Sequence, residues 1–295
     1  MREASDLGSH PSMTSRPDYL PSFLNPPVVE TVLSVQFESL RGISTAQLGL
    51  LWNEFSDNFP RTEDQAALLP FVEEFPESPR ARLGLQLQAL DKPPVPRMWF
   101  VNARGNEMIQ VQADRFIRNW RKEGQGEEYP RYERLKDAFQ RDFDVFQRFL
   151  SDRNLGLPKI NQCEVSYVNH IIAGEGWQTF ADFDKVFSVW VTPSDWAARA
   201  DQIPGRAEDV RIQSRFVIPD DKGKPVGRLH VDIQPALRTT DSKPMYLLHL
   251  TARGQVGSGA EFFDLGRRWI VKSFASLTNA EMHRIWQRTD IRGNS

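Results

Sequence analysis

The side chains best suited to chemistry in this chain are the arginines of one short segment. Arg115, Arg118 and Arg121 lie within residues 114–121, DRFIRNWR, beside Phe116 and Trp120. An arginine guanidinium presents a planar set of donors that matches a carboxylate or a phosphate. The segment is therefore a candidate clamp for an anionic ligand. The alternative is a structural role, because aromatic residues four positions apart usually pack into a core.

A second set of polar side chains alternates with apolar residues and predicts strands with one polar face. Such a face can bind a polar ligand, a protein or nucleic acid, or it can simply face solvent. Combining both sets, we predict these ligand- or partner-binding residues: Gln110, Gln112, Arg115, Arg118, Arg121, Arg211, Gln213 and Arg215.

Metal and catalytic sites receive less support. The histidines show no close spacing typical of a metal site, although His230, His249 and Asp232 can form a two-histidine, one-carboxylate set if their strands meet. Cys163 with His170 is a weak nucleophile pair, and a lone cysteine is usually a small apolar residue. Residues 254–259, GQVGSG, lack the lysine of a phosphate loop. We predict no catalytic residue, no metal and no cofactor.

Composition and charge exclude several classes of protein. The formal net charge is −2, so no whole-molecule field attracts nucleic acid or anionic lipid. No apolar run approaches the ~18 residues of a spanning helix, so we expect no membrane partner. The single cysteine fits a reducing compartment. We expect a cytoplasmic protein with a disordered leader at residues 1–25.

The remaining chain reads as two units with the same order of elements. Gly156 and Pro158 mark the boundary, which gives units at residues 26–157 and 158–295. Each unit has a strand, a helical connection, antiparallel strands and a long helix. Ser44, Ser258 and Thr278 are expected to cap helices. Strands are expected at 28–39, 70–75, 82–89, 161–172, 210–218, 228–234 and 246–252, with a hairpin within 97–122 and helices from 44, at 132–153 and at 261–288.

This pattern predicts an α+β fold. The two tandem units form a curved antiparallel sheet with helices on one face, because one face of each strand is apolar. The order resembles TATA-binding-protein-like and helix-grip folds, an analogy that carries no function by itself. Phe139, Phe143 and Phe146 are expected to be a buried stripe of the first long helix.

Three motifs connect the chain to a known family. They are PPVVE at residues 26–30, QVQADRFIRNWR at residues 110–121, and Tyr167 with Asn169 in a Tyr-x-Asn strand. By these motifs the chain resembles a sporadically distributed bacterial family of uncharacterised proteins, over nearly its whole length after the leader. The family has no established activity, so the resemblance assigns no role to individual residues. The scattered occurrence of the family implies mobile, accessory or defence-associated genes.

These observations favour a non-enzymatic binding or interaction protein with a protein partner. The hypothesis depends on the polar, amide-rich strand faces and on the lack of a catalytic motif. A nucleic-acid-binding protein that uses the curved sheet and its arginines is one alternative. A hydrolase or nuclease with an unrecognised site is another. The residues alone leave both alternatives open.

Overall fold

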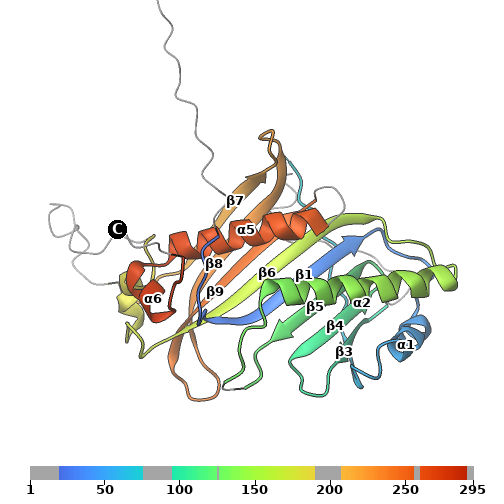
Figure 1. Cartoon of the computed structure of the whole chain (residues 1–295), viewed down its shortest axis with the longest axis horizontal. Helices are drawn as coiled ribbons and strands as arrows, with labels where there is room; N and C mark the ends of the chain where they lie inside the picture. Colours follow the sequence, from blue (N-terminus) through green and yellow to red (C-terminus); the bar gives the residue numbers. More distant parts are fainter. Residues whose placement is uncertain (1–19, 76–94, 125, 190–206, 256–259, 291–295) are drawn as a thin grey trace, which may run out of the picture.

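The computed structural model describes residues 20–75, 95–124, 126–189, 207–255 and 260–290. This part of the chain is an α+β protein with one antiparallel sheet of nine strands, which confirms the predicted class (Figure 1). The strands are β1 (Val28–Phe37), β2 (Arg61–Gln65), β3 (Arg97–Val101), β4 (Glu107–Gln112), β5 (Arg115–Arg121), β6 (Ile160–Ile172), β7 (Ile212–Pro219), β8 (Pro225–Leu237) and β9 (Pro244–Gly254). The helices are α1 (Thr45–Asn53), α2 (Tyr132–Asp152), the 3₁₀ turn η2 (Phe180–Asp182), α3 (Phe183–Val186), α5 (Ala260–Leu277) and α6 (Ala280–Ile285).

The sheet joins the two halves of the chain at its centre. Its strand order is β2-β3-β4-β5-β1-β6-β9-β8-β7, and β1 pairs with both β5 and β6. Because β1 lies in the first half of the sequence and β6 in the second, the backbone ladder is continuous across both. In the described chain β2 and β7 are the edge strands.

The two long helices pack against different strands. α2 contacts β5 and β1, whereas α5 contacts β6, β9 and β8, and both lie in front of the sheet in Figure 1. Phe139, Phe143 and Phe146 are buried as expected. Their ring centroids lie 5.3 to 5.7 Å from that of Phe116 on β5. Burying these rings contributes much of the stabilisation on this side of the molecule.

The helix caps agree with the sequence at one position and differ at another. Ser44 caps α1, and its hydroxyl accepts from the Gln47 N–H at 3.3 Å. The cap expected at Thr278 is wrong, because Asn279 caps α6 by accepting from the Met282 N–H at 3.1 Å. The Thr278 hydroxyl instead donates to the carbonyl oxygen of Phe274. Ser258 lies outside the described residues.

Three expectations about the first half differ from the structure, wholly or in part, or lie outside its described residues. Residues 70–75 are not a strand, and the edge strand β2 just before them was not predicted. The strand expected at 82–89 and residues 1–19 of the leader lie outside the described residues. Residues 20–25 of the leader are packed rather than disordered, since Phe23 is buried and its ring lies 5.3 Å from that of Phe274.

Within the described parts of the chain, no helix is long and apolar enough to cross a membrane.

Candidate binding face of the sheet

Residues 66–75, which we call the strap, follow β2 and lie across one face of the sheet. The rings of Phe37 and Phe116 pack against Phe146 of α2 on the opposite face. Successive side chains of a strand point to opposite faces. Gln36 and Arg115, which neighbour these rings in sequence, therefore point toward the strap. We name this side of the sheet the strap face.

Four polar side chains form a row beneath the strap. Gln112 of β4 pairs with Arg115 of β5, Arg115 with Gln36 of β1, and Gln36 with Gln162 of β6. The row thus crosses four adjacent strands. Three strand spacings of roughly 4.8 Å make it about 14 Å long, which an extended chain of about five residues matches.

The first half of the row binds the strap through its backbone. The side-chain amide of Gln112 accepts from the Leu68 N–H and donates to the Leu68 carbonyl oxygen, both at 2.9 Å. Arg115 donates to the carbonyl oxygen of Leu69 at 3.2 Å. Burial lowers the pKa of Arg115, as expected for a guanidinium covered by the strap.

The second half of the row continues the same pattern. The Oε1 atom of Gln36 accepts from the Phe71 N–H at 2.9 Å. Gln162 donates to the Phe71 carbonyl oxygen and accepts from the Glu73 N–H, both at 2.7 Å. These amides satisfy strap backbone groups as a neighbouring strand would. The sheet therefore holds an extended segment across its strands. The hydrogen bonds go to the backbone of that segment, so they do not depend on most of the segment's side chains.

Glu73 is the buried anchor of the strap. Its side chain is 2% exposed and forms an ion pair with Arg228 of β8. His230 Nε2 lies 2.6 Å from the second carboxylate oxygen of Glu73. Arg228 also donates to the carbonyl oxygen of Glu74 at 2.8 Å, and its guanidinium lies 4.2 Å from the ring centroid of Phe75. One arginine thus contacts three successive residues of the strap.

The charge state of Glu73 follows from these contacts. Burial alone would raise its pKa, because a low-dielectric environment disfavours the carboxylate. The hydrogen bonds and charges of His230 and Arg228 outweigh burial and hold the pKa of Glu73 below its ordinary value of 4.5. Glu73 is therefore ionised at neutral pH.

Apolar side chains of the strap remain accessible. Leu69, Phe71 and Val72 are 65%, 40% and 44% exposed. A groove of about 200 Å³ runs beside the strap, and its lining includes Glu73 and Lys224. The strap is thus held firmly from below and is open to contact from above.

The structure brings three of the predicted binding residues together on β4 and β5. Gln112 and Arg115 contact the strap directly. Gln110 lies on the same face, where it accepts from Arg97 at 2.9 Å and donates to Asn119 at 3.0 Å. These side chains were expected to meet water or a partner. Gln110 and Gln112 are instead buried by groups of the chain itself.

Arg118 does not belong to this face, which corrects the expected arginine clamp. It is buried on the helix-bearing side, where it forms ion pairs with Glu107 at 2.6 Å and with Asp142 of α2 at 2.9 Å. Arg118 lies two residues from Phe116 on a strand, so both side chains point the same way. Arg121, at the far end of β5, donates to the carbonyl oxygen of Gly105 at 3.1 Å.

The remaining predicted residues lie at the β7 edge of the sheet. Gln213 and Arg215 of β7 pair with Asp232 and His230 of β8, which places them on the strap face. Arg211 immediately precedes β7. All three are exposed, and β7 is an edge strand of the described sheet. The structure therefore separates a covered group on β4 and β5 from an exposed group at β7, and Arg118 and Arg121 belong to neither.

The nucleophile and metal hypotheses find little support. Cys163 and His170 lie seven positions apart on β6, about 23 Å at the usual rise per residue. Burial raises the pKa of the Cys163 thiol to about 12, which disfavours the reactive thiolate. His230 is bonded to Glu73, whereas His249 pairs in register with Asp232. Among the described residues, no group of three histidine, cysteine or acidic side chains is arranged to hold a metal ion.

One hydroxyl–imidazole contact on the strap face was not predicted. Ser166 Oγ lies 2.6 Å from His249 Nε2 and 2.6 Å from the hydroxyl oxygen of Thr251. Burial lowers the pKa of His249, so its imidazole is neutral at pH 7 and one of its two ring nitrogens is a hydrogen-bond acceptor. Ser166 is 3% exposed. This arrangement resembles a nucleophile with its base, but the hydroxyl is not accessible.

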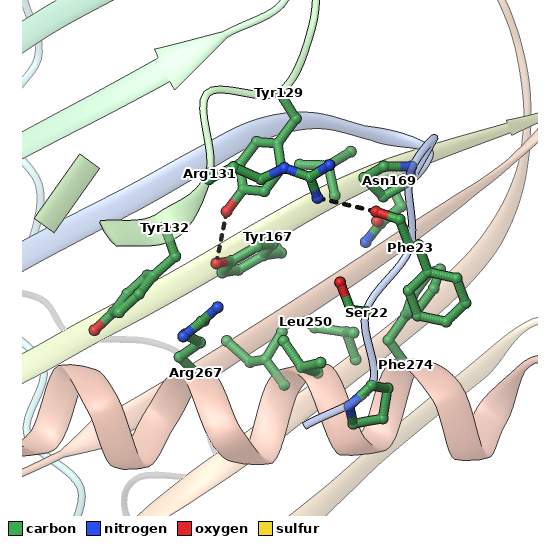
Figure 2. A pocket seen from close by; sticks show the side chains of 15 residues that line it. Ser22, Phe23, Tyr129, Arg131, Tyr132, Tyr167, Asn169, Leu250, Arg267 and Phe274 are labelled. Carbon is green, nitrogen blue, oxygen red and sulfur yellow. Dashed lines mark hydrogen bonds between the residues drawn. The ribbon is translucent and has the colours of Figure 1, made fainter. Parts of the chain in front are cut away.

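A small cavity on the helix-bearing side is shown in Figure 2. It measures about 90 Å³, below the roughly 300–1,000 Å³ usual for ligand pockets. The hydroxyl groups of Tyr129 and Tyr167 lie 2.9 Å apart at its wall, and burial raises the pKa of both. Arg131 donates to the carbonyl oxygen of Phe23 at 2.9 Å and so holds the start of the described chain over the cavity. The contacts around this cavity fit a structural role.

Comparisons with known proteins indicate no family. No protein-family model matches the chain, and no curated protein matches it. Among solved structures, the chain is similar to the duplicated taurocyamine kinase from Schistosoma mansoni, with 12% identity and a TM-score of 0.29. The match covers 84% of this chain and 33% of that chain, so this chain spans about a third of that protein. A likeness this distant carries no argument about activity.

Sequence reasoning missed four residues that hold the strap: Gln36, Glu73, Gln162 and Arg228. A signal for the glutamines existed, because Gln36 and Gln162 occupy the polar positions of alternating strands as Gln112 does. No local signal marks Glu73 as buried, since it lies in an acidic stretch typical of a solvent-exposed segment.

Proposed function

We propose that this protein is a non-enzymatic interaction protein that binds an extended segment of a partner protein on the strap face. The observation that supports this proposal is the set of hydrogen bonds that backbone N–H groups of the strap donate to the side-chain oxygens of Gln36, Gln112 and Gln162. Main-chain hydrogen bonds give affinity to many peptide-binding proteins, and pockets for side chains give specificity. The strap face offers both kinds of contact.

We also propose that the sheet is a curved, duplicated platform with its helices on one face, as in TATA-binding-protein-like or helix-grip folds. The strand order supports this reading. Outward from the central β1–β6 pair, the sheet reads β5, β4, β3 on one side and β9, β8, β7 on the other. α2 follows β5 and α5 follows β9 in the sequence. Duplication of a unit such as residues 26–157 produces this symmetry.

Site-specific photo-crosslinking tests the proposed binding face. A crosslinking amino acid replaces Val72, on the exposed side of the strap, or Arg148, which is exposed on α2. We expect the partner in cells to be captured from position 72 and not from position 148. Binding of that purified partner should then weaken when Gln36 and Gln162 are both changed to alanine. Capture from position 148 alone would refute the proposed face.

A nucleic-acid-binding role is the second candidate. Arg115, Arg228 and Arg253 all contribute to the strap face. Arg228 and Arg253 are, however, already paired with Glu73 and Glu164, which leaves less charge for phosphate. Binding to DNA or RNA that falls steeply with salt would favour this candidate, since phosphate contacts release counterions.

A hydrolytic role is the third candidate, and the contact between Ser166 and His249 is the observation that favours it. This role requires that a substrate reach Ser166, whose side chain belongs to a residue only 3% exposed. The groups that cover Ser166 would have to move. Turnover that disappears in the Ser166→Ala variant would favour this candidate over binding alone. We retain a cytoplasmic location and an accessory or defence-associated locus as further proposals.

A further inference from the structure

The strap contacts the sheet as a bound peptide contacts a receptor. It forms no strand of the sheet, and side chains rather than a backbone ladder satisfy its N–H and C=O groups at Leu68, Phe71 and Glu73. One of its side chains, Glu73, enters a charged pocket made by a strand from the other half of the chain. These are the two elements of peptide recognition, namely backbone bonds and a specificity pocket.

The specificity pocket requires a carboxylate. Arg228 and His230 approach separate oxygen atoms of Glu73, whose side chain is almost fully removed from solvent. A neutral side chain at this place would leave the buried Arg228 without its ion pair, which is strongly unfavourable. The pocket therefore distinguishes an acidic residue from any apolar or basic one.

Aromatic side chains flank the acidic residue at matching positions. The guanidinium of Arg253 lies 5.6 Å from the ring centroid of Phe71. The guanidinium of Arg228 lies 4.2 Å from the ring centroid of Phe75. Residues at i−2, i and i+2 of an extended chain point to the same side. An arginine near an aromatic face adds a favourable cation–π contact. The strap thus presents the pattern aromatic-x-Glu-x-aromatic to the sheet.

We propose that the strap is the resident occupant of this site, and that a partner peptide with an aromatic-x-acidic-x-aromatic core displaces it. This inference rests on the proposed function and names its ligand class and its regulation. Displacement is feasible because Leu69 and Val72 are exposed and a groove runs beside Glu73. The strap competes as a tethered ligand, with the high effective concentration that a short linkage gives.

A labelled peptide of residues 66–75, AALLPFVEEF, tests this inference with three full-length proteins: the parent, Glu73→Ala and Glu74→Ala. Glu73→Ala removes the anchor of the strap, so the peptide should bind this protein at least about tenfold more tightly than the parent. Glu74→Ala removes the same charge from an exposed neighbour whose carbonyl group alone contacts Arg228, and it should bind the peptide as the parent does. Equal binding to all three proteins would overturn the inference.

Variants of the peptide separate recognition from nonspecific adhesion. The peptide that carries alanine at Glu73 should lose binding to the Glu73→Ala protein, whereas the peptide that carries alanine at Glu74 should retain it. If Glu73→Ala fails to fold, Glu73→Gln, which preserves the side-chain volume, replaces it with the same expected result. Adding Gln36→Ala and Gln162→Ala to either protein should abolish peptide binding. Binding that survives these two changes would show that the peptide uses another surface.

The outcome can be distinguished from failure of the proposed function. If the peptide does not bind but a cellular partner crosslinks from position 72, the strap face is an interaction surface and the displacement inference is wrong. If the partner crosslinks only from position 148 on α2, the proposed function itself is wrong.

Discussion

Glu73 of the strap and Arg228 of β8 form a buried ion pair although 155 positions separate them in the chain. The strap begins at the edge strand β2, whereas β8 lies next to the edge strand at the other side of the sheet. The pair therefore ties the two halves of the sheet together on the strap face.

The contribution of Glu73 should depend on pH in a defined direction. Its pKa in the folded protein lies below the ordinary value of 4.5, so the ion pair stabilises the fold fully above that value. The contribution is lost as the pH falls below about 4.5 toward the lowered pKa. We expect the difference in free energy of unfolding between the parent and Glu73→Gln to be largest at neutral pH and to shrink in acid. Chemical denaturation at several pH values measures it, and Glu74→Gln should show no such trend.

Gln162→Ala should loosen the strap without disturbing the sheet. The change removes two hydrogen bonds of 2.7 Å to the backbone of Phe71 and Glu73, each worth about 1 kcal/mol net. Hydrogen exchange of strap peptides should therefore become about tenfold or more faster, while exchange in β6 stays protected. Gln213→Ala, on the same face but exposed, serves as the control. Unchanged strap exchange in Gln162→Ala would contradict the role of the row.

Arg118→Ala should destabilise the fold much more than loss of a surface arginine. It leaves the half-buried Asp142 without its ion pair and Glu107 with only the exposed Arg134, and breaking a buried pair costs about 3–5 kcal/mol. Arg134→Ala is a matched control, since Arg134 lies 3.8 Å from the same Glu107 with a side chain 72% exposed. We expect at most about 1 kcal/mol from that exposed pair. Urea denaturation of both variants tests the contrast.

Phe143→Ala should cost about 3–5 kcal/mol, because the ring is buried against Phe116 and its removal leaves a cavity between α2 and β5. Thermal unfolding should show a large decrease in the melting temperature. Arg148→Ala, exposed on the same helix, should melt close to the parent. A Phe143→Ala protein that melts like the parent would contradict the packing of α2 on the sheet.

Changing both Arg211 and Arg215 to alanine should leave stability nearly unchanged, since both residues are exposed at the edge of the sheet. The same change should weaken binding of the partner if the strap face extends to β7. Calorimetry of unfolding and a binding measurement with the purified partner test the two parts separately. Unfolding of the double variant would show that these arginines are structural.

The sequence by itself determined the features that depend on local periodicity. Alternation of apolar and polar residues placed Gln110 and Gln112 on one face of a strand, and spacing by three or four placed Phe139, Phe143 and Phe146 on one face of a helix. Both patterns arise because the backbone geometry of a strand or helix fixes which side chains point together. The α+β class followed from these elements.

The direction in which Arg118 points can be known only from the pairing of β5 with its neighbouring strands. Phe116 and Trp120 are four positions apart, a spacing that places residues on one face of a helix and equally on one face of a strand. Only the ladders to β1 and β4 decide that this segment is a strand. With that decision, Arg118 shares the face of Phe116 and meets Asp142 rather than a ligand.

Only the tertiary structure determines where the strap lies and which groups it contacts. Residues 70–75 have the composition of a strand, yet their backbone partners are the side chains of Gln36 and Gln162, and the partner of Glu73 is Arg228. No local pattern encodes contacts between segments so far apart in the chain. A charged residue such as Glu73 becomes a buried anchor only when the folded sheet brings Arg228 and His230 to one place, because an isolated carboxylate gains more from water than from an apolar surface.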